Sequence, residues 1–282
     1  MTAITTLEEH ACFGGVQGFY EHLSTTVGLP MRFGVYRPPQ VGQGPLPVLF
    51  CLAGLTCNEQ TFAIKAGAQQ HAARHGLVLV TPDTSPRNTG VAEADAQGWD
   101  FGTGAGFYLD ATQEPYARHW RMETWLTQEL PPLLVADFSC DVSRAGVTGH
   151  SMGGHGALTL ALRHPQLFRS VSAFAPITAP TEVPWGQKAF TGYLGADPGS
   201  WREHDAVQLV GQGRQLPPAL VDQGLWDPYL SSQLRPERLE QACADAGVAL
   251  TLRRHEGYDH GYFFVQTFVG DHVEHHAKAL RG

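Results

Sequence analysis

Residues 145–156 read Ala-Gly-Val-Thr-Gly-His-Ser-Met-Gly-Gly-His-Gly. A short apolar run leads into the pattern G-x-S-x-G at residues 149–153, and apolar side chains then recur at helical spacing until Pro165. A tight turn between a strand and a helix exposes a serine Oγ, and glycines beside it remove Cβ atoms that would collide with the flanking elements. The sequence therefore predicts a strand, a turn and a helix, with Ser151 as candidate nucleophile. The alternative is a glycine-rich turn in which the serine is only a polar cap.

The rest of the chain alternates short apolar runs with helical stretches. Residues 31–36 alternate between apolar and other side chains and are closed by two prolines, which predicts an antiparallel strand at the edge of a sheet. Central strands are predicted at residues 48–52, 77–80, 146–148, 171–174, 219–221 and 249–252. Helices are predicted at residues 59–74, 120–135, 152–163, 236–246 and 263–280. This alternation is typical of an α/β protein with a mainly parallel central sheet and helices on both faces. Because no linker or repeat divides the chain, we expect one domain over residues 1–282.

Composition excludes several classes of partner. The chain has 282 residues, 43% of them apolar, and a formal net charge of −8, so no broad basic face is available for nucleic acid or anionic lipid. The apolar runs are far shorter than a membrane span, and the N-terminus does not read as a secretory leader, so we expect a soluble, cytoplasmic protein. Five cysteines cannot all pair within one chain, and we expect reduced thiols.

Two long segments, residues 87–116 and 176–201, show no periodicity. Both are rich in residue types that break helices and strands, and the first is also rich in aromatic side chains. Long irregular segments in compact domains are usually functional, and in α/β sheets they gather beyond the carboxyl ends of the strands, where ligands bind. We therefore expect both to be walls of a substrate cleft. The alternative is that they are insertions packed on the surface.

A serine hydroxyl needs a base within hydrogen-bonding distance and a carboxylate that orients the base. In the α/β-hydrolase fold these groups follow the nucleophile in the order acid, then histidine. His260 lies in the loop Gly-Tyr-Asp-His-Gly, between the last predicted strand and the final helix, and is the predicted base. His255, within or at the end of that strand, is expected to be a wall residue of the cleft.

Three more histidines, His272, His275 and His276, fall on the closing helix at a spacing that could bind a metal. No carboxylate or fourth ligand clearly converges on them, and histidines near a helix C-terminus interact favourably with the helix dipole. We therefore expect no metal at these positions and no cofactor.

Two aspartates follow the penultimate predicted strand and are candidates for the acid. Asp222 directly abuts the strand, whereas Asp227 lies five residues further on and can fold back towards the histidine loop, so we prefer Asp227. Asp259 is expected to be structural, because adjacent side chains in an extended loop diverge.

An oxyanion hole requires the N–H that follows the nucleophile and a second N–H from the loop after an early strand. Met152 supplies the first. Leu55 is our candidate for the second, ahead of Gly54, because a glycine in the loop at residues 52–57 lets an N–H approach the reaction centre.

Nine segments spread along the chain resemble one known family. They are Cys-Phe-Gly-Gly at 12–15, Gly-Leu-Thr-Cys-Asn-Glu at 54–59, Pro-Asp-Thr-Ser-Pro-Arg at 82–87, Trp-Asp-Phe-Gly-Thr-Gly-Ala-Gly-Phe-Tyr at 99–108, Gly-His-Ser-Met-Gly-Gly-His-Gly at 149–156, Ser-Ala-Phe-Ala-Pro at 172–176, Pro-Trp-Gly at 184–186, Asp-Gln-Gly at 222–224 and Gly-Tyr-Asp-His at 257–260. Several are far more specific than G-x-S-x-G. On these segments the chain resembles the S-formylglutathione hydrolases, also called the esterase D family, over nearly its whole length.

The resemblance implies a serine thioesterase that releases glutathione and formate from S-formylglutathione, in formaldehyde detoxification. It implies Ser151, Asp227 and His260 as a catalytic triad, amides of Leu55 and Met152 as the oxyanion hole, and a homodimer. It also implies that Cys57 lies beside the active site, where its alkylation would obstruct turnover; the alternative is a buried, inert thiol. We expect Trp99 and Trp185 as walls of the cleft. Glutathione is anionic and needs cationic or amide donors at the rim, which the sequence does not identify.

The chain departs from the family pattern near the site. Pro228 and Tyr229 follow Asp227 where the family has phenylalanine and leucine, and the loop to His260 is one residue shorter. Residues 88–90, Asn-Thr-Gly, also differ and lie beside the expected cleft, so the acyl preference could shift.

Three other functions fit parts of the same pattern. A broad-specificity carboxylesterase would use the same residues on small oxygen esters, and an acyltransferase of the mycolyl-transfer type would share the fold and triad but is an exported enzyme. A binding or scaffold protein would keep the fold with a vestigial triad. Rates on thioester and ester substrates, transfer to an added alcohol, and labelling by a fluorophosphonate distinguish these functions.

Overall fold

The computed structural model describes residues 3–281, apart from the side chains of residues 93 and 95. In this part of the chain nine strands form one sheet in the order β1-β2-β3-β5-β4-β6-β7-β8-β9. Neighbours from β1 to β5 in this order are antiparallel, and those from β5 to β9 are parallel. The strands are β1 (Ile4–Cys12), β2 (Gly15–Leu23), β3 (Pro30–Arg37), β4 (Leu46–Leu52), β5 (Val78–Pro82), β6 (Cys140–His150), β7 (Phe168–Phe174), β8 (Ala219–Gly224) and β9 (Thr251–His255). The mainly parallel sheet is confirmed, and strands lie at all six predicted positions. The strand predicted as central at residues 249–252 is however β9, which lies at an edge of the sheet.

The expected position of the sheet edge was wrong. Residues 31–36 lie within β3, which pairs with β2 on one side and β5 on the other, so the edge at this end of the sheet is β1, and β9 forms the other edge. The β1–β2 hairpin turns at Phe13 and Gly14, whose φ values of +45° and +76° suit a two-residue hairpin loop. Nearly all side chains of β1 are exposed, so no alternation of apolar residues marks this strand in the sequence.

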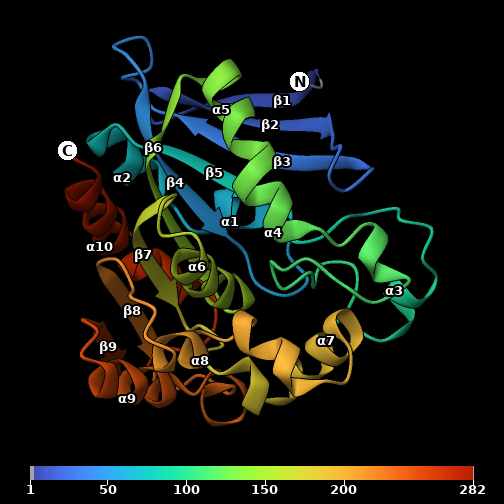
Figure 1. Ribbon diagram of the computed structural model, residues 1–282. Coiled ribbons are helices and arrows are strands. Elements are labelled where there is room, and N and C mark those ends of the chain that lie inside the picture. Colours follow the sequence, from blue (N-terminus) through green and yellow to red (C-terminus); the bar gives the residue numbers. More distant parts are fainter. Residues whose placement is uncertain (1–2, 282) are drawn as a thin grey trace.

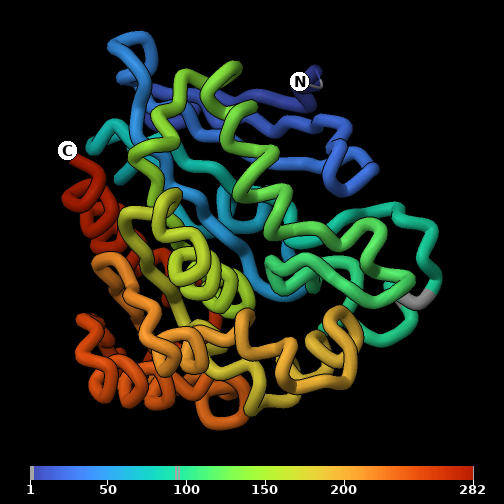
Figure 2. Tube along the Cα trace, viewed as in Figure 1, coloured from blue at the N-terminus to red at the C-terminus, as the bar shows by residue number. Residues whose placement is uncertain are grey.

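Helices cover both faces of the sheet, as predicted. On one face α1 (Glu59–Lys65), α2 (Gln69–His75) and α10 (Tyr262–Leu280) pack on the strands, and on the other lie α5 (Leu130–Phe138) and α6 (Met152–Arg163). Figure 1 shows α5 and α6 crossing in front of the sheet, and the C-terminal end of α10 lies beside α2 in Figures 1 and 2. On the outer side of α6 lies α8 (Ala206–Gly211), which in turn packs against α9 (Pro236–Ala246). Within residues 3–281, no helix has the length and apolarity needed to cross a membrane.

Two predicted helices are interrupted. The helix expected at residues 59–74 is divided into α1 and α2 by Gly67, whose φ of +68° is incompatible with a helix. The helix expected at residues 120–135 begins later and passes through α4 (Met122–Thr124) and a wide π turn at Trp125–Glu129 before α5. Pro131 and Pro132 follow this turn and have no N–H to continue the regular hydrogen-bond ladder.

The two irregular segments pack against each other at one side of the molecule. The Tyr193 hydroxyl accepts a hydrogen bond from the Gly102 N–H (2.9 Å) and donates one to the Ala105 carbonyl (2.9 Å). Phe101 stacks on the Tyr193 ring with centroids 4.5 Å apart. The helices of these segments, α3 (Glu93–Ala96) and α7 (Pro184–Leu194), lie near each other on the right of Figure 1. The two segments therefore form one unit rather than two separate insertions.

Candidate active site

The turn between β6 and α6 holds Ser151 in a conformation that side chains rarely adopt. Its φ is +59° and its ψ is −119°, and its N–H donates to the Phe174 carbonyl (2.9 Å). A Cβ on Gly149 would lie 2.1 Å from the Gly153 carbonyl oxygen, and one on Gly153 would lie 2.1 Å from the Leu52 carbonyl oxygen. Both glycines are therefore required for β6, the turn and β4 to approach so closely.

In the structure Ser151, His260 and Asp227 form a chain of two hydrogen bonds. Nε2 of His260 lies 2.9 Å from Oγ of Ser151, and Nδ1 lies 2.6 Å from Oδ2 of Asp227. Because a carboxylate only accepts hydrogen bonds, Nδ1–H donates to Asp227, which leaves Nε2 free to accept the Ser151 proton. Asp227 is itself held by the Tyr229 N–H, which donates to Oδ1 (2.8 Å). These three side chains have the geometry of a nucleophile, its base and an orienting acid.

Asp222, the other candidate for the catalytic acid, has a different set of partners. Arg253 donates to both of its oxygens (2.7 and 2.6 Å), and His272 and His255 lie 3.3 and 3.4 Å away. Burial by itself raises the pKa of Asp222, but hydrogen bonds from His272 and Arg253 outweigh it and hold the pKa well below its ordinary value. Asp222 is thus occupied in an ion-pair network away from His260.

The other histidines and Asp259 also have local partners. His255 stacks on Phe268 (3.8 Å between centroids) and does not line the cavity around Ser151, so its expected position as a wall residue was wrong. Both ring nitrogens of His276 contact serines, Nδ1 with Ser170 (2.7 Å) and Nε2 with Ser172 (2.8 Å).

His275 Nε2 lies 3.2 Å from the Val171 carbonyl oxygen, and His272 stacks on Phe174. Asp259 accepts the N–H of Gly261 (2.8 Å), in line with the structural role expected for it. In residues 3–281, apart from the two side chains left out above, no three His, Cys, Asp or Glu side chains form a group that could hold a metal.

Two N–H groups are available beside Ser151. Met152 begins α6, and Leu55 lies in the turn from Gly54 to Cys57, which the Cys57 N–H closes by donating to the Gly54 carbonyl (3.3 Å). A Cβ on Gly54 would lie 3.2 Å from the Cβ of Ser151, so this turn packs directly on the nucleophile. Among the described residues, neither the Leu55 nor the Met152 N–H donates to another backbone group. Both can therefore donate to an oxyanion, and the N-terminus of α6 adds a favourable dipole.

A cavity of ≈ 180 Å³ opens over Ser151. The three expected cleft residues Cys57, Trp99 and Trp185 line it together with His260. The turn at Gly54 and the turn at Ser151 also contribute to the lining. Its lining is Gly54, Leu55, Cys57, Trp99, His150, Ser151, Trp185, Tyr229, His260 and Tyr262. One wall comes from the unit formed by the irregular segments, where Trp99 meets the edge of Trp185 at 5.6 Å. Pockets for drug-sized ligands occupy about 300–1,000 Å³, so this one suits only a small acyl group.

Three cavity residues were not singled out as wall residues from the sequence. Tyr229 stands between Trp185 (4.8 Å) and His260 (5.1 Å), and Tyr262 and His150 form an adjacent aromatic pair at 5.3 Å. Tyr229 was noticed only as a departure from the family pattern. His150 is the variable residue of G-x-S-x-G, and Tyr262 is the first residue of α10, two positions after His260; proximity to a motif was the one available signal.

The charge state of His150 favours the expected chemistry. Its ring lies 4.7 Å from that of His260 and is 6% exposed. Burial first, and the nearby charge of His260 second, hold the pKa of His150 well below its ordinary value. A neutral His150 does not oppose the positive charge that His260 acquires when it takes a proton.

Cys57 has the opposite behaviour to an activated thiol. Burial raises its pKa, more than nearby hydrogen bonds and Lys65 lower it. The thiol is therefore protonated at neutral pH and is a weak nucleophile, although it lines the cavity. Its expected role as a guard of the cleft stays a prediction.

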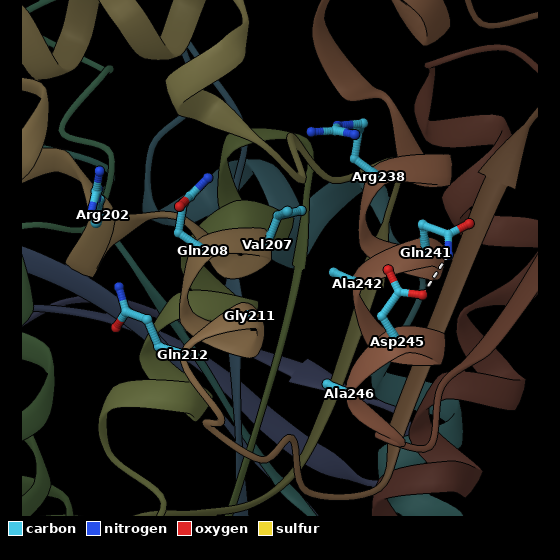
Figure 3. A pocket seen from close by; sticks show the side chains of 10 residues that line it. All are labelled: Arg202, Val207, Gln208, Gly211, Gln212, Arg238, Gln241, Ala242, Asp245 and Ala246. Carbon is cyan, nitrogen blue, oxygen red and sulfur yellow. Dashed lines mark hydrogen bonds between the residues drawn. The ribbon is translucent and has the colours of Figure 1, made fainter.

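Figure 3 shows another pocket, between α8 and α9, and Ser151 is not among the residues that line it. Its lining includes Arg202, Gln208, Gln212, Arg238 and Gln241. Arg238 is held by Glu182 (2.8 Å), and Gln241 by Asp245 (2.7 Å). The pocket contains no candidate nucleophile, so the cavity over Ser151 is the candidate active site.

The chain is similar to known proteins over nearly its whole length. The Esterase family, described as "Putative esterase", matches residues 24–276. S-formylglutathione hydrolase from Mus musculus is 49% identical over 281 residues, which covers 99% of this chain and 99% of the mouse protein.

Solved structures show the same likeness. An S-formylglutathione hydrolase from Agrobacterium tumefaciens superposes with a TM-score of 0.95 at 45% identity, covering 98% of this chain and 99% of the other. A fluorophosphonate-binding serine hydrolase from Staphylococcus aureus, covering 93% of this chain and 98% of its own, has a TM-score of 0.72 at 19% identity, which shows a shared fold alone.

Proposed function

Because the chain belongs to the S-formylglutathione hydrolase family and has the α/β-hydrolase fold, we propose that it hydrolyses S-formylglutathione to glutathione and formate. One observation carries the reaction: Oγ of Ser151 lies 2.9 Å from Nε2 of His260 at the base of a small cavity. The full-length likeness to S-formylglutathione hydrolases carries the choice of substrate. A place in formaldehyde detoxification follows from that substrate.

The residues would act in the following order. Ser151 Oγ attacks the formyl carbonyl while its proton passes to Nε2 of His260, and Asp227 stabilises the resulting imidazolium. The negative oxygen of the tetrahedral intermediate accepts hydrogen bonds from the N–H groups of Leu55 and Met152. The carbon–sulfur bond then breaks, and the leaving thiolate takes the proton from His260. Water then attacks the formyl ester on Ser151 while its proton passes to His260. His260 returns this proton to Ser151 Oγ as the ester bond breaks and formate leaves.

The size of the cavity supports a small acyl group. A volume of ≈ 180 Å³ accommodates a formyl carbon and the atoms beside the sulfur, whereas the rest of the tripeptide must extend past Trp99. Trp99 is 55% exposed and therefore stands at the rim, while Trp185 is 8% exposed and stands inside. Long acyl chains would collide with Trp185 and Tyr229.

Kinetics on two substrates test the proposal. The purified protein is expected to have a higher kcat/KM for S-formylglutathione than for a short aryl acetate, and Ser151→Ala should lose both activities and fluorophosphonate labelling. A preference for the aryl ester would instead favour the broad-specificity carboxylesterase. If the unmutated protein were never labelled, the enzymatic assignment would fall.

We also propose that the protein works in the cytoplasm and that it forms a homodimer, the latter as the family resemblance implies. The five cysteines are free thiols, which suits a reducing compartment. Light scattering on the eluting peak of a gel-filtration column measures the mass in solution. A mass of about 61 kDa, twice the 30.7 kDa of one chain, is expected.

A further inference from the structure

The turn that carries the Leu55 N–H contains an unfavourable backbone conformation. Thr56 has a φ of +68°, in the left-handed region that β-branched residues avoid. The turn itself is closed by one long hydrogen bond, from the Cys57 N–H to the Gly54 carbonyl (3.3 Å). Contacts from elsewhere in the chain must therefore help to hold this turn against Ser151.

Those contacts come from residues 83–87 and the segment they support. The Cys57 carbonyl oxygen accepts hydrogen bonds from Nη2 of Arg87 (2.9 Å) and from Oγ1 of Thr84 (2.6 Å). The Thr56 N–H donates to the Gly104 carbonyl (2.9 Å), and the Gly104 N–H donates to Oγ of Ser85 (2.8 Å). Both ends of the strained residue are thus anchored to the loop that follows β5.

Arg87 is itself held in place by a buried carboxylate. Its Nε donates to Oδ2 of Asp83 (2.7 Å) and its Nη2 donates to Oδ1 (2.8 Å), which is the two-pronged geometry that fixes a guanidinium. The Asp83 side chain is 3% exposed, and its Oδ1 also accepts the Thr84 N–H (2.7 Å). The same Nη2 group, fixed by Asp83, donates the hydrogen bond to the Cys57 carbonyl oxygen.

We propose that Arg87, locked by Asp83, is a positioning residue that keeps the Leu55 N–H directed at the oxyanion. Arg87 does not line the cavity and acts through the Cys57 carbonyl. The inference rests on the proposed function only for the role of the Leu55 N–H in acyl transfer, and it holds for thioester and oxygen-ester substrates alike. Because oxyanion stabilisation acts on the transition state, loss of Arg87 should lower kcat with little change in KM.

Arg87→Gln and Arg144→Gln form a matched pair for the test. Arg144 likewise binds a nearby aspartate, Asp141 (2.6 Å), and a backbone carbonyl, that of Pro45 (3.0 Å), but at the opposite ends of β4 and β6. For each variant we would measure kcat and KM on a short aryl ester and Tm by thermal unfolding. The affinity for a boronic acid inhibitor that mimics the tetrahedral intermediate is measured as well.

For Arg87→Gln we expect kcat to fall by about 10- to 100-fold, less than the ~100- to 1,000-fold that follows loss of an oxyanion-hole donor itself. KM should stay within about twofold, inhibitor affinity should fall by a similar factor to kcat, and Arg87→Lys should recover part of the loss. Arg144→Gln should leave kcat unchanged, even if the substitution lowers Tm. A folded Arg87→Gln protein with the kcat of Arg144→Gln would overturn the inference.

Thr84→Val covers the case in which Arg87→Gln does not fold. It removes one of the two donors to the Cys57 carbonyl with nearly the same side-chain shape, and we expect a several-fold loss of kcat with matching loss of inhibitor affinity. Unchanged kcat in this variant would contradict the proposal. The aryl ester separates this test from the proposed function, because failure of the unmutated protein on S-formylglutathione alone would leave the result for Arg87 intact.

Discussion

Nδ1 of His260 lies 2.6 Å from Oδ2 of Asp227, whereas Asp222, five residues earlier, is bound by Arg253 and two other histidines. This difference predicts that the same substitution lowers kcat at Asp227 and lowers Tm at Asp222. Asp227→Asn should lower kcat by about 10⁴-fold with a small change in Tm, because an amide no longer fixes the tautomer of the base. Asp222→Asn should mainly lower Tm. Measured kcat and thermal unfolding of both variants check this, and a reversed pattern would assign the acid to Asp222.

Gly153→Ala should damage both stability and activity. The added Cβ would lie 2.1 Å from the Leu52 carbonyl oxygen, so β4 and the turn at Ser151 must move apart. Such overpacking costs about 1–3 kcal/mol. Gly211→Ala is the control, because a Cβ there meets nothing within 4 Å. Urea unfolding and kcat measure the two effects, and equal behaviour of the two variants would show that close packing at the turn is unimportant.

Lys65 is expected to attract the anionic part of the substrate. Its Nζ lies 5.9 Å from the centroid of Tyr262, a cavity residue, and Lys65 forms no ion pair with any side chain that the structure describes. The other two lysines, Lys188 and Lys278, pair with Asp100 and Glu274. Lys65→Ala should raise KM for S-formylglutathione by about two- to fivefold, the effect of one exposed charge contact, and leave a neutral aryl ester unaffected.

Lys278→Ala, at the far end of α10, should change KM for neither substrate. The increase for Lys65→Ala should shrink as salt is added, because salt screens exposed charges. An equal change in KM for the charged and neutral substrates would rule out an electrostatic role.

Alkylation of Cys57 should obstruct the cavity. Burial raises the pKa of this thiol, so its reaction with iodoacetamide should be slow at pH 7 and faster as the pH rises. Loss of esterase activity should follow the labelled fraction of Cys57, measured by peptide mass spectrometry. Cys57→Ala should resist inactivation under the same conditions. Full activity after complete labelling of Cys57 would exclude steric obstruction.

His204 is expected to weaken the protein in mild acid. Burial, and then the charge of Arg163, lower its pKa from 6.5 to about 4. Below pH 6.5 the unfolded chain binds a proton that the folded chain refuses until about pH 4, so the free energy of unfolding falls as the pH falls through this window. His204→Gln should reduce the slope by up to ~1.4 kcal/mol per pH unit. Urea unfolding at several pH values measures it, with the exposed His10→Gln as control; an unchanged slope would contradict the prediction.

Sequence reasoning reached the parts of the site that depend on local chain geometry. Ser151 and Met152 follow from a turn that only glycines permit, and His260 and Asp227 follow from loops at the ends of consecutive strands. The structure places these groups together, and their roles stay predictions until the variants are measured. His255 was misplaced because a strand residue can face either side of the sheet, and a five-residue strand leaves that choice open.

The remaining features depend on contacts between distant segments. Tyr229 and Tyr262 both line the cavity although one lies in a loop and the other begins α10, and no periodicity relates them. The edge strand β1 is exposed along nearly its whole length and is recognisable only through its pairing with β2. Gly67 could have suggested the break between α1 and α2, but an isolated glycine in a helical pattern is often tolerated.

The hydrogen bonds that Tyr193 makes to Gly102 and Ala105 have a consequence for how such a protein can change over evolution. They join the two irregular segments into one body, and that body carries Trp99 and Trp185, whereas Ser151, Asp227 and His260 follow strands β6, β8 and β9 of the sheet. Substitutions at Trp99 or Trp185 can widen or narrow the entrance without displacing Ser151 or His260. Trp99 and Trp185 can therefore vary and alter the acyl substrate while the catalytic residues stay the same. Arg87 and Gly104 of the same body are instead constrained by the hydrogen bonds that they make to the turn at Thr56 and Cys57.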